Sequence, residues 1–213
     1  MKKSMLHNSI LAIVSLVILY YIFYRWLDIP IAQWLRQHLN DSTLVKLSLG
    51  IKIVFSPQVW LVIALASLII GCWMHYGQKR TTMAQPWLFF SMAYFLAFIL
   101  GFIFKFILAR YRPELLFQSN VYGFDFFKLK DAFNSTPSGH ALANFAALYA
   151  IAKILNKRAV TILLMLLATV ICFSRVIILD HYVSDVIFGA YVGILSVYWM
   201  SAFFTLKKIN PSV

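Results

Sequence analysis

From Trp87 to Phe104 the chain has no charged residue, and only Lys105 interrupts the apolar run before Leu108. A helix needs about 20 mostly apolar residues to cross the roughly 30 Å hydrocarbon core of a bilayer, so this run is sufficient for one crossing. Hydrophobic residues make up 62% of the sequence and charged residues 12%, whereas average soluble proteins are roughly 25% charged. Such a chain cannot bury its apolar surface in a water-soluble globule, and lipid is its expected solvent.

The same criterion predicts six membrane-spanning helices within a single domain of residues 1–213. The predicted fold class is an all-α membrane protein, a bundle of six transmembrane helices with its active site at one membrane face. The spans are expected at Ile10 to Leu27, Ile53 to Met74, Trp87 to Leu108, Gly139 to Leu155, Ala159 to Leu179 and Val183 to Phe204.

The first, second and fourth spans have features that need an explanation. Lys2 and Lys3 precede the first span, so a cleavable signal peptide is the alternative there. No small-residue cleavage site follows, and residues 24–27 are typical of an interfacial anchor, which favours a retained span. Pro57 and Asn144 predict that the second and fourth spans pack against protein.

An even number of spans places both ends of the chain on one side of the membrane. Nine Lys and Arg residues fall on that side and ten on the other, which also holds all seven acidic residues. Setting aside Lys105, Arg112 and Arg175, which are assigned to a site below, reduces the ten to seven. Because Lys and Arg are enriched in cytoplasmic loops, we expect cytoplasmic ends and a site facing the periplasm or exterior, in a bacterial cytoplasmic (inner) membrane.

The net charge of +12 is spread over short loops, which favours anionic lipid headgroups over nucleic acid as the partner. Cys72 and Cys172 fall inside different spans near opposite faces, so neither a disulfide nor a metal site is predicted. The longest non-apolar stretch of the sequence, Ala109 to Pro137, is expected to be a functional loop. The sequence leaves the oligomeric state open.

The first of three polar groups ends the third span, where the chain reads K-F-I-L-A-R-Y-R-P from Lys105 to Pro113. Lys105 and Arg112 are seven residues apart, close to two helical turns, which predicts that they project from one face. Pro113 biases the chain to leave the helix there. Two cations would then meet at the membrane edge, although both could instead be anchors that extend to the interface.

The second group is Pro137, Ser138, Gly139 and His140 at the start of the fourth span. The start of a helix has free backbone N–H groups and the positive end of the helix dipole, and glycine lets an anion approach closely. This pattern predicts a phosphate-binding turn with a histidine beside it. The alternative is a simple helix-capping turn.

The third group, Ser174, Arg175, His181 and Asp185, extends from the end of the fifth span to the start of the sixth. His181 and Asp185 are four residues apart, so on a helix the carboxylate could accept a hydrogen bond from one imidazole nitrogen. The other nitrogen would then be available as a nucleophile. A purely structural His-Asp pair is the alternative. By the parity of the spans all three groups emerge on the same face, which a random scatter of polar residues would not do.

In this order, K-x6-R-P, P-S-G-H and S-R-x5-H-x3-D resemble the three signature motifs of the type 2 phosphatidic acid phosphatase (PAP2) superfamily. Vanadium-dependent haloperoxidases are relatives that share the same pocket. Every motif position matches, and the six-span pattern resembles the membrane branch of the family over nearly the whole chain. The resemblance implies a phosphatase of lipid phosphates, a hydrolase of phosphoric monoesters or acid anhydrides that uses neither a metal nor another cofactor.

The resemblance also implies a role for each motif residue. His181 would attack phosphorus to form a phosphohistidine, with Asp185 orienting it and His140 protonating the leaving oxygen and then activating water. Vanadate is expected to inhibit. The phosphoryl oxygens would be held by Lys105, Arg112, Ser138, Gly139 and Arg175.

Several substrates fit this interpretation: undecaprenyl or another polyprenyl diphosphate, phosphatidic acid, phosphatidylglycerophosphate and lipid A phosphate. Aromatic and aliphatic residues in the loop after the third span suit a membrane-embedded lipid, although they could only anchor the loop. A lipid phosphotransferase using the same phosphohistidine is the first alternative. A non-enzymatic transporter is a remote one, because the polar cluster lies at helix ends and not at mid-membrane.

Overall fold

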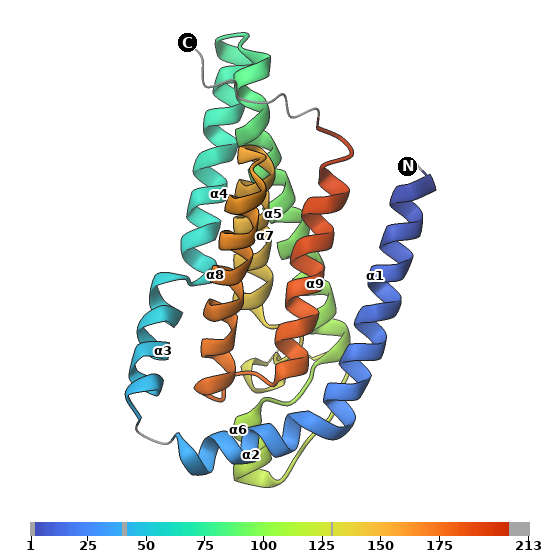
Figure 1. Cartoon of the computed structure of the whole chain (residues 1–213), viewed down its shortest axis with the longest axis vertical. Coiled ribbons are helices and arrows are strands. Elements are labelled where there is room, and N and C mark those ends of the chain that lie inside the picture. The colour runs from blue at the N-terminus through green and yellow to red at the C-terminus, as the bar shows by residue number, and fades with distance from the viewer. Residues whose placement is uncertain (1–2, 40–41, 129, 205–213) are drawn as a thin grey trace.

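The computed structural model describes residues 3–39, 42–128 and 130–204, and this part of the chain forms nine α-helices and no strand. Most of the helices run along the length of the molecule, whereas α2 lies across one end (Figure 1). The predicted all-helical fold is confirmed. The helices are α1 (Lys3–Ile22), α2 (Asp28–His38), α3 (Thr43–Val54), α4 (Pro57–Cys72), α5 (Thr81–Leu108), α6 (Pro113–Ser119), α7 (Gly139–Leu155), α8 (Arg158–Ile177) and α9 (Val183–Met200).

Five helical stretches of the described chain are long and apolar enough to cross a membrane. The remaining predicted span, the fourth, corresponds to α7, which has 17 residues and rises about 26 Å at 1.5 Å per residue. The count of six therefore remains a prediction. The five stretches are Lys3–His38, Thr43–Gly77, Thr81–Leu108, Arg158–Ile177 and Val183–Met200.

The first two predicted spans differ in detail from the observed helices. The first ends in a π-helical turn at Phe23–Leu27 and continues beyond its expected end into α2. The second begins at Pro57 and not at Ile53, and a short break after Val54 separates it from α3, a helix that the sequence did not predict. Ser56 caps α4, since its side chain accepts a hydrogen bond from the backbone N–H of Val59 at 3.4 Å. The break places α3 beside α8 at the same end of the bundle as α2 (Figure 1).

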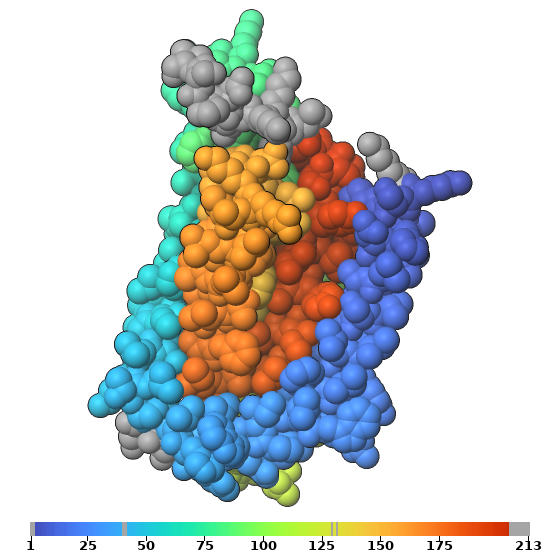
Figure 2. All heavy atoms as spheres, viewed as in Figure 1, coloured from blue at the N-terminus to red at the C-terminus, as the bar shows by residue number. Residues whose placement is uncertain are grey.

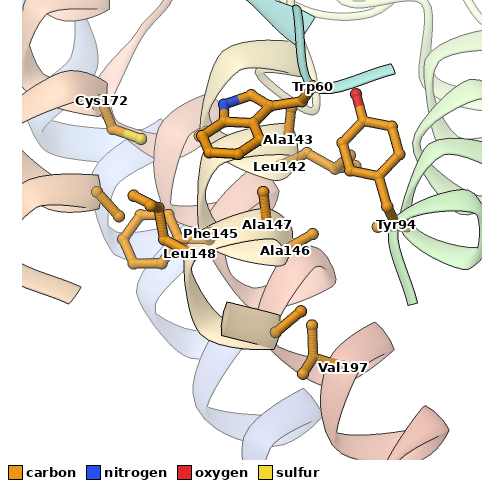
Figure 3. Close-up of a cluster of buried hydrophobic side chains, with 14 of the residues drawn as sticks. Trp60, Tyr94, Leu142, Ala143, Phe145, Ala146, Ala147, Leu148, Cys172 and Val197 are labelled. Carbon is orange, nitrogen blue, oxygen red and sulfur yellow. The ribbon is translucent and has the colours of Figure 1, made fainter. Parts of the chain in front are cut away.

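Helix α7 lies at the centre of the bundle and packs against α5, α8 and α9 (Figure 3). Its small alanine side chains allow this close packing, and most of its residues are buried. Asn144, a fully buried polar residue in this helix, is satisfied because its Oδ1 accepts a hydrogen bond from Trp60 Nε1 at 2.9 Å. The expectation that the fourth span packs against protein is confirmed.

The outer faces of α1, α4, α5 and α8 expose large apolar side chains, as expected for surfaces in contact with lipid. Between α1, α5 and α9 there is an apolar groove of about 570 Å³, and its opening can be followed between α1 and α9 in Figure 2. Tyr20 and Tyr24 line the end of this groove that is nearest to α2.

Candidate active site

Three segments far apart in the sequence meet at one end of the bundle: the end of α5 with the loop after it, the start of α7, and the turn between α8 and α9 (Figure 1). His181, in that turn, is only 3% exposed. Burial, and then the nearby positive charges of Arg112, Lys105 and Arg175 together with His140, lowers the pKa of His181 well below its ordinary value. The structure therefore brings residues of all three predicted groups together around His181.

In the first group, the two cations reach the site from different structural elements. Helix α5 ends at Leu108, so Lys105 lies in its last turn and Arg112 lies beyond it, just before α6. The prediction that one helical face carries both is wrong, because the helix ends between them. Lys105 Nζ donates to the carbonyl of Asn134 at 2.6 Å, and Arg112 Nη1 to the carbonyl of Asp180 at 3.5 Å.

In the second group, Ser138 is the residue before the first turn of α7. Its backbone N–H donates to the backbone carbonyl of Asp185 at 3.0 Å, which connects the start of α7 to α9. A Cβ atom added at Gly139 would lie 4.0 Å from Lys105 Cε, so the lysine side chain passes directly over this glycine. The helix start thus faces a cation, as the phosphate-binding interpretation requires.

His140 follows in the first turn of α7. Its Nε2 atom is 3.1 Å from the backbone carbonyl of Lys52 in α3. A carbonyl oxygen can only accept, so Nε2 carries the hydrogen in this contact and Nδ1 is the atom left for proton transfer. The carbonyl of His140 accepts from Asn144 Nδ2 at 2.9 Å, which supports the same turn.

In the third group, Arg175 lies in the last turn of α8 and is buried. Its carbonyl accepts from the backbone N–H groups of Asp180 at 3.1 Å and His181 at 3.4 Å, so the chain folds back to bring His181 next to Arg175. His181 precedes α9, which begins at Val183. The predicted helical spacing of His181 and Asp185 is therefore wrong, because His181 lies in the turn before the helix.

Asp185 is close to His181 but not hydrogen-bonded to it, since His181 Nδ1 and Asp185 Oδ2 are 3.9 Å apart. The carboxylate is occupied by other donors and interacts with the ring through its charge. Those donors are Arg110 Nη1 at 2.6 Å, Ser135 Oγ at 2.5 Å, the backbone N–H of Tyr182 at 2.8 Å, and Thr136 Oγ1.

Arg110 was not among the predicted site residues, yet it is fully buried beside Asp185. Its Nη2 atom donates to Asp28 Oδ2 at 2.8 Å and its Nη1 atom to Ser184 Oγ at 2.6 Å. A signal for this pair was present in the sequence, because Arg110 and Asp28 have opposite charges and each follows a predicted span on the same side. Five aromatic rings have their centroids 4.5 to 5.8 Å from the guanidinium carbon: Tyr20, Tyr24, Tyr122, Phe124 and Tyr182.

Several buried polar atoms at this end of the bundle have no hydrogen-bond partner among the residues that the structure describes. They include Ser138 Oγ, Arg175 Nε and Nη1, and His181 Nδ1. An unsatisfied buried group costs about 1–3 kcal/mol, and buried polar groups are normally paired. Guanidinium, hydroxyl and imidazole groups clustered in this way are suited to an anion with several oxygen atoms.

A model of a protein family, described as the PAP2 superfamily, matches residues 86–209, more than half of the chain. The chain belongs to the PAP2 superfamily. The matched segment contains all three of the motifs described above and most of α5 together with α6 to α9. A search of curated proteins found no match.

The PAP2 assignment agrees with a comparison of folds. The structure is similar to the crystal structure of a protein described as the first transmembrane PAP2 type phosphatidylglycerolphosphate phosphatase from Bacillus subtilis. The TM-score is 0.61 at 19% sequence identity, over 96% of this chain and 98% of that one. The present chain is thus an integral membrane member of the PAP2 superfamily. Its helices α1 to α4, which lie before the matched segment, belong to the same fold.

The described residues contain no group of three or more His, Cys, Asp or Glu side chains that could hold a metal ion. The positive charge around His181 comes from lysine and arginine side chains.

Proposed function

We propose that this protein removes phosphate from a lipid-linked phosphate or diphosphate through a covalent intermediate on His181. The observation that supports this function best is the cluster of His181, His140 and three cations around buried donors that have no partner within the described chain. Phosphoryl transfer depends chiefly on positioning and on stabilising negative charge, and these are the groups that supply both.

In the first step, a ring nitrogen of neutral His181 attacks phosphorus, and the bond from phosphorus to the lipid oxygen breaks. His140 begins this step protonated on both ring nitrogens, and the leaving oxygen takes the proton from its Nδ1 atom. Lys105, Arg112 and Arg175 stabilise the charge on the phosphoryl oxygens, and the N–H groups at the start of α7 add to this stabilisation. The negative charge of Asp185, 3.9 Å from His181 Nδ1, stabilises the imidazole as it becomes positive.

In the second step, His140 accepts a proton from a water molecule, which attacks the phosphohistidine and releases inorganic phosphate. His181 returns to its neutral form, and no other co-reactant is needed. If another lipid replaced water, the same intermediate would support transfer. Release of free phosphate without an added acceptor distinguishes the two reactions.

The position of the site suits an amphiphilic substrate. His181 is at the end of the bundle, while the outer faces of the helices are apolar, so a phosphate can reach the cations while its lipid tail remains among the helices. Polyprenyl diphosphates and glycerolipid phosphates, including phosphatidylglycerophosphate, are the preferred classes. Release of phosphate from a panel of these lipids by the purified protein identifies the substrate.

The nucleophile is tested with His181→Asn. We expect this variant to lose turnover and the acid-labile phosphoenzyme that is trapped with a radiolabelled substrate. His7→Asn, a change of an exposed histidine in α1, is the matched control and should retain both. Ordinary activity in His181→Asn would refute the assignment, and activity that disappears with a chelator and returns with a divalent cation would refute the metal-independent mechanism.

A further inference from the structure

Lys52 reaches the site from the last turn of α3, which lies outside the three motifs and outside residues 86–209. Its Nζ atom donates to Asp180 Oδ2 at 2.9 Å. Arg175 Nη2 donates to the same oxygen. Because one carboxylate oxygen joins both groups, the ammonium of Lys52 and the guanidinium of Arg175 are separated by no more than two hydrogen bonds.

These three side chains extend from the surface into the interior. The side chain of Lys52 is 41% exposed, that of Asp180 24% and that of Arg175 3%. Asp180 also lines, together with Arg112 and Arg36, a polar hollow of about 420 Å³ between α2, α6 and the turn before α9. Asp180 therefore contacts both this hollow and Arg175, so its negative charge acts on an anion that enters the hollow.

The same turn of α3 contacts the proposed acid. The backbone carbonyl of Lys52 accepts a hydrogen bond from His140 Nε2 at 3.1 Å. Lys52 is thus in contact with His140 through its backbone and close to Arg175 through its side chain. A residue with both contacts lies at the edge of the space where a phosphoryl group would be bound.

We infer that Lys52 is a further phosphoryl-binding residue, and that Asp180 is an internal anion that holds Lys52 and Arg175 together and competes with the substrate for them. This inference rests on the anion site proposed above. Carboxylate and phosphoryl oxygens accept the same charge-assisted hydrogen bonds from ammonium and guanidinium groups. Asp180 therefore occupies a position that a phosphoryl oxygen can take, and its charge opposes an incoming phosphate.

The inference is tested by the binding of orthovanadate and inorganic phosphate to the purified protein in detergent, measured by calorimetry. Asp180→Asn keeps the shape of the side chain and removes its charge, so we expect about tenfold tighter binding of both anions. Lys52→Met should weaken binding about tenfold. Lys52→Arg restores the cation and should recover most of the affinity.

The double variant, Lys52→Met with Asp180→Asn, distinguishes direct binding of the anion by Lys52 from an indirect effect of Lys52 through Asp180. If Lys52 binds the anion itself, Lys52→Met also weakens binding when Asp180 is already Asn. If Lys52 only holds Asp180 in place, Lys52→Met has no effect in that background, and the inference is overturned. Weaker binding in Asp180→Asn overturns it as well, because Asp180 would then be needed to position Arg175.

Lys46→Met is the matched control, since Lys46 is exposed on the same helix and its replacement changes the net charge equally. It should leave anion binding unchanged, and a loss equal to that of Lys52→Met would show a general charge effect and overturn the inference. Thermal unfolding of each variant verifies that it is folded. Failure of the phosphohistidine proposal would appear in His181→Asn turnover, whereas failure of this inference would appear only in the binding series.

Discussion

The guanidinium of Arg110 lies between two carboxylates, Asp28 and Asp185, and all three side chains are fully buried. Asp28 belongs to α2 and Asp185 to α9, so this one side chain connects the first and last parts of the chain. Desolvation makes such a network a weak source of net stability, but removing one member leaves an uncompensated buried charge. Arg110 therefore holds Asp185 in position beside His181.

Replacing Arg110 by methionine should destabilise the protein by about 3–5 kcal/mol, because both carboxylates lose their buried partner. The measurement is the midpoint of thermal unfolding in detergent. Arg36→Met is the control: Arg36 is exposed over the ring of Phe117, 4.2 Å from its centroid, and we expect a loss of about 1 kcal/mol or less. Equal midpoints for the two variants would contradict the structural role of Arg110.

His181 should be neutral at pH values where an ordinary histidine is already charged. Burial and the positive charges of Arg112, Lys105 and Arg175 lower its pKa, so the ring loses its proton at a lower pH and the proposed nucleophile is neutral above that pH. The neutral form is lost only as the pH falls through the lowered value.

Nitrogen-15 spectra of histidine-labelled protein measure this titration, and His181→Asn identifies the resonance by its disappearance. Phosphoenzyme formation should retain its rate into mildly acidic solution for the same reason. A midpoint at or above the ordinary histidine value of about 6.5 would show that the cations do not act on the ring as described.

At this scale the motif residues could be predicted, because His181, His140, Arg175 and their companions fall in a recognisable order along the chain. Arg110 and Lys52 were not predicted, since their roles depend on contacts between the first helices and the motif segments, and motif spacing does not show these contacts. Hydrogen bonding was predicted less well than proximity. The His181–Asp185 pair illustrates this, because spacing predicted a hydrogen bond and the carboxylate binds four other donors.

Among the helices, α7 and α9 pack tightly near the site. A Cβ atom at Gly189 of α9 would lie 2.6 Å from the carbonyl oxygen of Ser138, and one at Gly193 would lie 2.7 Å from that of Leu142. Any side chain at these positions must push the two helices apart. The contact at Gly189 thus sets the position of the turn that begins α7.

Gly189→Ala should destabilise the protein by about 1–3 kcal/mol, as expected when a methyl group is forced into a packed interior. It should also weaken vanadate binding, because the start of α7 moves with Ser138. Thermal unfolding and calorimetry measure the two effects.

Gly50→Ala in α3 is the control, because its added Cβ would meet no atom within 4 Å. We expect about 0.5–1 kcal/mol of stabilisation there, since alanine loses less conformational freedom than glycine in a helix. If Gly189→Ala changed neither the midpoint of thermal unfolding nor vanadate binding, α7 and α9 would not be held at this distance.

The helices themselves were predicted with different success. Length and apolarity place α5, α8 and α9 well, because a membrane-spanning helix needs little else. The break between α3 and α4 was missed, although Ser56 and Pro57 are a typical helix start. Pro57 was interpreted only as a reason for packing against protein, and the break is what brings Lys52 to the site.

At the scale of the whole molecule, the site lies at one end of the bundle, with α2 and α3. The start of α1, the connection between α4 and α5, the connection between α7 and α8, and the end of α9 lie toward the other end (Figure 1). This arrangement agrees with the parity argument from the sequence. The direction of the bundle in the membrane is a separate matter, because the counts of Lys and Arg on the two sides are nearly equal.

Labelling of single cysteines with a membrane-impermeant maleimide determines this direction. After replacement of Cys72 and Cys172, Gln118→Cys reports on the site end and Tyr76→Cys on the opposite end, and both positions are exposed. We expect Gln118→Cys to react in intact cells and Tyr76→Cys only in inside-out vesicles, because the charge comparison favours cytoplasmic ends of the chain. Reaction of both from one side would contradict a bundle that crosses the membrane along its length. The reverse pattern would keep the bundle but turn the site to the cytoplasm, where a lipid phosphate of the inner leaflet would be the substrate to test.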